Sequence, residues 1–213
     1  MTVVDLRHGA AAQAIRRQRL IVILRRVGPV DHLVALIEEL ADAGARIFEV
    51  TFDDPAAAEG LKAGAERLAG RSDGPFLVGA GTIRTEDQLR AATDAGAAFG
   101  VSPTFNRDLV DAAVTAGLPF IPGAATPTEV EAAWQSGATF VKLFPASSLG
   151  PAFVRELRGP MREIETIPTG GINAANALQF LDAGAVAIGI GSALLKANQD
   201  QRRSLVEAVG ASG

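Results

Sequence analysis

The sequence of 213 residues lacks cysteine altogether and has only two histidines, His8 and His32. Disulfides and thiolate metal sites are therefore excluded, and a reducing compartment is compatible with this composition. Neither histidine follows an expected strand, so the chain offers no histidine cluster for a metal-dependent reaction. Mg²⁺ on Asp53 and Asp54 is the remaining metal alternative. We expect neither a metal nor another cofactor.

Long apolar runs and blocks of basic residues are also missing. The first twenty residues have no apolar core of signal-peptide length, and no stretch reaches the ~18 apolar residues of a membrane span. The net charge is −4, and the arginines at positions 16, 17 and 19 are interpreted as a solvated helix face. We therefore expect a cytoplasmic protein that binds neither membranes nor nucleic acid.

The chain instead shows a repeated alternation of short apolar runs and helical patterns. The runs are bounded by turn residues and several are β-branched, as is typical of buried parallel strands. They are Leu20–Leu24, Ile47–Phe52, Phe76–Val78, Phe99–Val101, Leu118–Ile121, Phe140–Phe144, Ile164–Ile167 and Val186–Ile190. Helices are expected between them, for example over Asp31–Ala43 and Thr126–Ser136, and one more at the amino terminus, around Asp5–Arg19.

Five helical patterns are followed by a glycine, which can adopt the left-handed conformation of a C-cap. These glycines are Gly44, Gly96, Gly117, Gly137 and Gly184. Eight strand–helix units fit the chain length, and no linker or low-complexity segment divides it. The sequence therefore predicts a single domain over residues 1–213, a (β/α)8 TIM barrel with an extra N-terminal helix. A doubly wound open sheet is the alternative.

Polar residues at the carboxyl ends of barrel strands are the candidates for an active site. Two charged residues, Glu49 and Lys142, stand within apolar runs. A desolvated lysine has a lowered pKa, and its neutral amine can attack a ketone to form a Schiff base. A nearby carboxylate can carry the protons that carbon–carbon cleavage requires. The alternative is a structural salt bridge between the two.

Two glycine-rich segments, PTGGIN and GIGS, end the last two expected strands. Phosphate commonly binds between the corresponding loops of such barrels, on backbone N–H groups that glycine leaves accessible. Simple turns are the alternative for each segment taken alone.

An ordered set of motifs carries a family resemblance. FEVTF, GAGT, VSP, PGAATPTE, VKLFPAS, PTGGI and GIGS follow one another between Leu20 and Leu195. Together they resemble the 2-keto-3-deoxy-6-phosphogluconate/4-hydroxy-2-oxoglutarate aldolase family. The resemblance implies a homotrimeric, metal-free class I aldolase on a (β/α)8 barrel. Such an enzyme cleaves a 2-keto-3-deoxy-6-phospho sugar acid to pyruvate and glyceraldehyde 3-phosphate.

The resemblance also implies residue roles. Lys142 matches the Schiff-base lysine, and Glu49 matches the general acid/base. Thr82 and Pro103 match the lining of the pyruvyl pocket, with Phe144 beside the imine. The matches to the phosphate-binding positions are Gly170, Gly171, Gly191 and Ser192.

One stretch departs from the family. Many members read TLRTP after the glutamate, with an arginine for the substrate carboxylate, whereas this chain reads TFDDP and has Asp53 at that position. Arg25, in VILR, matches a carboxylate-binding arginine of members that resemble 6-phosphogalactonate aldolases, and FPASSLGP is also similar to that branch. Asp54 is interpreted as the cap of the next helix, with Pro55 in its first turn.

Other functions stay open at this stage. One is an aldolase for 4-hydroxy-2-oxoglutarate or another 2-keto acid. A phosphosugar isomerase or synthase would share the phosphate loops but has no need of an amine within a strand. A non-catalytic barrel that binds a phosphorylated metabolite would have no use for the pair of Lys142 and Glu49. The stereochemistry of the sugar acid also stays open.

Overall fold

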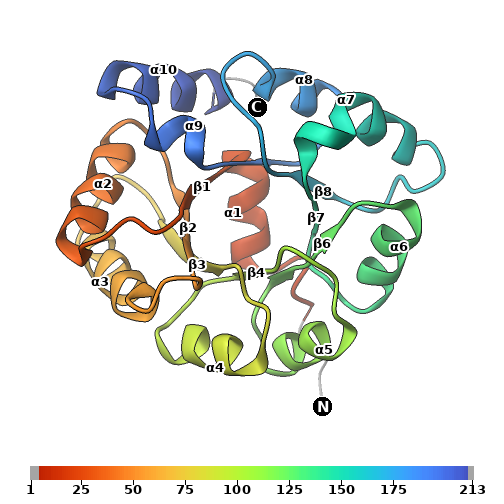
Figure 1. The fold of residues 1–213 in the computed structure, drawn as a ribbon, viewed down its shortest axis with the longest axis horizontal. Coiled ribbons are helices and arrows are strands. Elements are labelled where there is room, and N and C mark those ends of the chain that lie inside the picture. The colour runs from red at the N-terminus through yellow and green to blue at the C-terminus, as the bar shows by residue number, and fades with distance from the viewer. Residues whose placement is uncertain (1–4, 211–213) are drawn as a thin grey trace.

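The computed structural model describes residues 5–210, which form a mixed α/β fold with parallel strands surrounded by helices (Figure 1). The strands are β1 (Leu20–Leu24), β2 (Ile47–Thr51), β3 (Leu77–Gly81), β4 (Gly100–Val101), β5 (Phe120–Ile121), β6 (Gly123–Ala124), β7 (Val141–Leu143), β8 (Thr166–Pro168) and β9 (Ile188–Ile190). The helices are α1 (Ala10–Gln18), α2 (Val30–Asp42), α3 (Ala57–Ala69), α4 (Glu86–Asp94), α5 (Arg107–Thr115), α6 (Pro127–Gln135), α7 (Ala146–Leu157), α8 (Ala177–Asp182), α9 (Ser192–Leu195) and α10 (Gln199–Gly210).

All strand pairs are parallel and form two curled sheets, with the orders β5-β4-β3-β2-β1-β9 and β6-β7-β8. A bridge between Thr169 and Gly189 connects the chain after β8 to β9. Only Pro122 separates β5 from β6. Proline has no N–H to donate to a ladder, so β5 ends before Pro122, as expected, and β6 begins just after it.

Each of the eight expected apolar runs overlaps a strand, and β6 is an additional segment that the sequence did not predict. The expected run 76–78 was too short, because β3 continues through two glycines. A Cβ at Gly79 would overlap the Phe99 ring, and a Cβ at Gly81 would overlap the Glu49 carboxylate. These glycines therefore mark close approaches along β3, which continues through Gly79 and ends only at Gly81.

The N-terminal helix is shorter than expected. It begins at Ala10, with Gly9 as its N-cap, rather than around Asp5. Residues 5–9 form a turn instead, in which an Asp5 carboxylate oxygen accepts from Arg7 N at 3.1 Å. The glycine caps are confirmed, since all five glycines expected after helices have positive φ. Their values are 103° at Gly44, 85° at Gly96, 71° at Gly117, 95° at Gly137 and 104° at Gly184.

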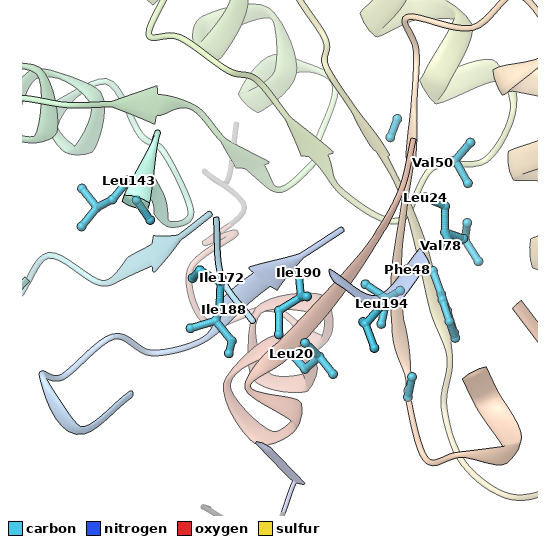
Figure 2. Packing of buried hydrophobic residues seen from close by; sticks show 14 of the residues in the cluster. Leu20, Leu24, Phe48, Val50, Val78, Leu143, Ile172, Ile188, Ile190 and Leu194 are labelled. Carbon is cyan, nitrogen blue, oxygen red and sulfur yellow. The ribbon is translucent and has the colours of Figure 1, made fainter. Parts of the chain in front are cut away.

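Buried side chains form two apolar clusters because residues alternate across each strand. The larger lies between the strands and the outer helices. Figure 2 shows part of it, where Leu20, Ile190 and Leu194 gather at the meeting point of β1, β9 and α9. The smaller joins Ile15 of α1 to inward residues at or just before the strand starts, such as Ile47 and Phe140. α1 thus covers the amino ends of the strands. Polar residues nearer the carboxyl ends of the strands face the opposite end of the fold.

The structure contains no helix in residues 5–210 that is both long and apolar enough to cross a membrane.

Candidate active site

Glu49 in β2 and Lys142 in β7 are almost completely buried, with 2% and 4% of their surfaces exposed. Each belongs to the inward set of its strand, two residues after Ile47 and Phe140 respectively. The chain therefore places both charged groups inside the fold, just beyond the apolar cluster that α1 covers.

Burial moves both groups toward their neutral forms. Desolvation raises the pKa of Glu49, and the positive charges of Lys142 and Arg25 only partly oppose it. Desolvation likewise lowers the pKa of Lys142, against the attraction of Glu49. No direct ion pair joins them in the described chain, and Glu49 Oε1 is buried without a hydrogen-bond partner. A neutral amine can attack a carbonyl, and a buried carboxyl with a raised pKa can exchange protons.

Neighbouring residues give these two side chains their space. Gly81 is required beside Glu49, since any Cβ there would overlap the carboxylate. The Phe144 ring centroid lies 5.1 Å from Lys142 Nζ. Gly170 packs against the other edge of this ring, where a Cβ would come within 3.1 Å. Phe144 and Gly170 therefore lie beside Lys142, together with the end of β8.

Arg25, which follows β1, lies at the open end of the strands and makes two side-chain contacts. Its Nη1 donates to Asp53 Oδ2 at 2.9 Å, and its Nη2 donates to Thr82 Oγ1 at 3.2 Å. Arg26 Nε lies 3.2 Å from the same Asp53 oxygen. Burial tends to raise the pKa of Asp53, but Thr51 and the two guanidinium groups outweigh it and lower that pKa. Asp53 is thus an ionised partner of two arginines, which the sequence did not predict.

The interpretation of Asp54 needs a correction. The N-cap of α3 is Ala56, without a side-chain cap, rather than Asp54. Asp54 Oδ1 instead accepts from Ala56 N at 2.9 Å, in a turn just before the helix. Pro55 lies in this turn and not in the helix. The aspartate still orders the entry into α3, but the helix begins two residues later than expected, at Ala57.

Pro103 reaches the site through its backbone. Its carbonyl packs so closely on Gly123 that a Cβ there would overlap it. Gly123 is the register partner of Lys142 in the neighbouring strand. Pro103 therefore lies one strand away from the buried lysine.

The two glycine-rich segments lie side by side, because Thr169 and Gly189 form a bridge between them. Gly170 and Gly171 have φ values of 94° and 78°, which glycine adopts without strain. Gly191 is the N-cap of α9, and Ser192, its first residue, is exposed. Of the candidate site residues, Ser192 has the weakest structural connection to Lys142 and Glu49.

Two residues near the candidates escaped the sequence analysis. Ser147, at the start of α7, lies against Gly171, where a Cβ would come within 2.5 Å, and its N–H donates to Gly170 O at 2.9 Å. Arg26 pairs with Asp53 as described. Their only sequence signal was position: Ser147 lies within the motif FPASSLGP, and Arg26 directly follows VILR. Among residues 5–210, no cluster of three or more His, Asp or Glu side chains could hold a metal ion.

Comparison with known proteins identifies the family. The family model described as KDPG and KHG aldolase matches residues 12–209. The chain belongs to this aldolase family. It is therefore related to lyases that break carbon–carbon bonds, and the buried lysine lies in an aldolase framework.

Three relatives of this aldolase-family chain are informative. A 2-dehydro-3-deoxy-6-phosphogalactonate aldolase from Escherichia coli strain K12 is 31% identical over 190 residues, 89% of this chain and 90% of the relative. A 2-dehydro-3-deoxy-phosphogluconate aldolase from Treponema pallidum strain Nichols is 39% identical over 172 residues, 79% and 78% of the two chains. The KDPG aldolase of Legionella pneumophila, solved with pyruvate captured as a covalent carbinolamine, superposes with a TM-score of 0.81 at 25% identity, covering 96% and 98%.

Proposed function

We propose that the protein is a class I aldolase that cleaves a 2-keto-3-deoxy-6-phospho sugar acid to pyruvate and glyceraldehyde 3-phosphate. The observation that carries this proposal is the burial of Lys142 and Glu49 together, with a lowered lysine pKa and a raised glutamate pKa. Family membership and the carbinolamine in the Legionella relative support it.

The reaction follows from these two groups. The neutral Lys142 amine adds to the C2 ketone, and the carbinolamine loses water to give an iminium ion. Glu49 accepts the proton of the C4 hydroxyl. The C3–C4 bond then breaks, and the electron pair of this bond moves to the iminium nitrogen. The aldehyde leaves, the resulting enamine is protonated at C3, and water releases pyruvate and the free lysine.

Arg25 would bind the substrate carboxylate, Thr82 and Pro103 would line the pyruvyl pocket, and Phe144 would pack beside the imine. Arg25 supports this role because it acts electrostatically on both Glu49 and Lys142. A guanidinium can pair bidentately with a carboxylate. Its placement after β1 matches members that resemble 6-phosphogalactonate aldolases, and Asp53 occupies the position of the arginine that many members of the family carry.

The phosphate would bind between the segments after β8 and β9, on Gly170, Gly171, Gly191 and Ser192. Support comes from the bridge that brings these segments together and from the positive φ of the first two glycines. Both curated relatives are named for phosphorylated substrates. An aldolase for the unphosphorylated 4-hydroxy-2-oxoglutarate would need no such site, so a panel of phosphorylated and unphosphorylated substrates separates the two.

The architecture would be one (β/α)8 barrel domain over residues 1–213, assembled as a homotrimer. Closure is supported by the bridge between Thr169 and Gly189 at one sheet boundary. At the other, Lys142 N donates to Pro122 O at 2.9 Å and Thr139 N donates to Phe120 O at 2.8 Å. The inner apolar cluster also takes residues from both sheets. Family resemblance alone supports the trimer, which sedimentation analysis would test.

Borohydride trapping tests the proposed chemistry directly. Incubation with pyruvate followed by reduction should add one reduced pyruvyl group per chain, on Lys142. Lys196→Arg is the matched control, because this exposed lysine should not affect the adduct. An unmodified protein, or an adduct on Lys62 or Lys196, would contradict the proposal.

A further inference from the structure

Unusual backbone geometry is concentrated at the open end of the strands. Three non-glycine residues in the range 5–210 have left-handed φ: Arg19, Arg26 at 51° and Thr82 at 58°. The last two belong to the cluster around Arg25. For a β-branched residue such as Thr82 this conformation is a true outlier, and such outliers gather where a site must be held in one geometry.

Arg25 is held from two sides in this cluster. Asp53 accepts from Nη1 and the Thr82 hydroxyl accepts from Nη2. A guanidinium has five N–H donors, so these two contacts leave about three for another ligand. The cluster therefore fixes the plane of the guanidinium without using up its capacity to bind a carboxylate.

Asp53 is itself fixed. Its Oδ2 receives both Arg25 Nη1 and Arg26 Nε. Its Oδ1 is buried without a hydrogen-bond partner. The carboxylate therefore faces the arginines with one oxygen and the protein with the other. Two arginines and one aspartate leave a net charge of +1, so the cluster attracts an anion rather than repelling it.

We infer that Asp53 is a positioning residue that orients Arg25 to bind the singly charged carboxylate of a 2-keto acid. Asp53 acts through Arg25 and does not touch the substrate, and Arg26 balances its charge. This inference rests on the proposed aldolase function. It makes the aspartate a part of carboxylate binding in this chain rather than an obstacle to it.

Pyruvate is the probe for the test, because it has the carboxylate and the ketone but no phosphate. The measurement is the pyruvate concentration that gives half-maximal borohydride trapping on Lys142. Asp53→Asn should raise this concentration about 10-fold, the scale of one charge-assisted hydrogen bond. The adduct at saturating pyruvate should stay at one per chain. Asp54→Asn is the matched control, with the same change of charge one residue away, and should stay within twofold of the wild type.

A double-mutant cycle identifies the route of the effect. If Asp53 acts through Arg25, then Asp53→Asn should change nothing further in an Arg25→Met background. An equal loss in both backgrounds would overturn the inference, as would tighter pyruvate binding by Asp53→Asn alone. If Asp53→Asn does not fold, Thr82→Val removes the other acceptor. It should raise the half-maximal concentration severalfold, and an unchanged value would also overturn the inference. Absence of trapping in the wild type would instead remove the aldolase proposal itself.

Discussion

Two pairs of ionisable residues lie in or just after strands β1, β2 and β7, but in different environments. Glu49 and Lys142 are buried and make no direct ion pair, and burial moves both pKa values toward the neutral forms. Arg25 and Asp53 lie nearer the solvent, with side chains 48% and 19% exposed, and are joined by a contact of 2.9 Å. The pKa of Asp53 is lowered, so this carboxylate stays ionised.

The contrast shows how one sequence region can supply both reactivity and binding. Desolvation without a close partner raises the free energy of the charged forms, so the inner pair can exchange protons and form a covalent bond. Close pairing with access to water preserves charge, so the outer pair suits electrostatic recognition. Glu49 of the inner pair and Asp53 of the outer pair are only four positions apart, in β2 and the residues that follow it.

The largest expected effect comes from removing the inner amine. Lys142→Met should lower kcat/KM by about 10⁴-fold or more, since loss of a nucleophile removes the whole covalent route. The melting temperature should hold or rise, because methionine fills the space without a desolvated charge. Steady-state kinetics and thermal unfolding check both parts. A variant that retains measurable Schiff-base trapping with pyruvate would show that the nucleophile lies elsewhere.

The next effect concerns the inner carboxylate. Glu49→Gln should slow cleavage by about 100-fold or more, the usual scale for a positioned acid/base, while pyruvate binding is kept. Wild-type turnover in this variant would favour the structural salt bridge.

Glu49→Gln should also change how the free energy of unfolding depends on pH. The folded-state pKa of Glu49 lies above its ordinary value of 4.5, so the native state holds its proton longer and loses stability as pH rises through the raised pKa. Glutamine removes this loss. The variant should match the wild type below pH 4.5 and become the more stable protein as pH increases, as urea unfolding across pH would measure. A constant difference at all pH values would contradict the raised pKa.

A smaller effect should follow from crowding the inner carboxylate without removing it. Gly81→Ala forces a Cβ into the Glu49 carboxylate, and overpacking of this kind costs about 1–3 kcal/mol. We expect a drop of about 10-fold in kcat/KM. Gly70→Ala is the matched control, because its φ is −79° and the nearest heavy atom to a Cβ there is at 3.9 Å. Equal behaviour of the two variants would show that β3 moves freely away from Glu49.

The strands and glycine caps could be predicted because each depends on local pattern. Apolar runs located every strand except β6, and glycines after helices were found with positive φ. The site was harder, because its contacts join distant segments. Nothing near Asp53 in the sequence indicates that it meets Arg25, which precedes it by 28 positions. β6 was missed because proline usually ends a strand, and the extension of β3 was missed because glycine usually does so, whereas Gly79 and Gly81 are required by close approaches.

The smallest expected effect comes from a charged pair outside the candidate site, which serves as a control for the inner and outer pairs. Arg16 of α1 and Glu165, which precedes β8, form a third charged pair at the opposite end of the strands. Arg16 also lies over the Phe140 ring at 5.0 Å, but no candidate site residue contacts this pair. Glu165→Gln should therefore lower the free energy of unfolding by only about 0.5–1 kcal/mol, as for partly exposed pairs, and the melting temperature by about 1–4 °C. The kcat/KM should stay within twofold of the wild type, in contrast to substitutions at Glu49 or Arg25. A tenfold loss of activity would show that α1 transmits its packing to Lys142, and the inner pair would then depend on more than its own desolvation.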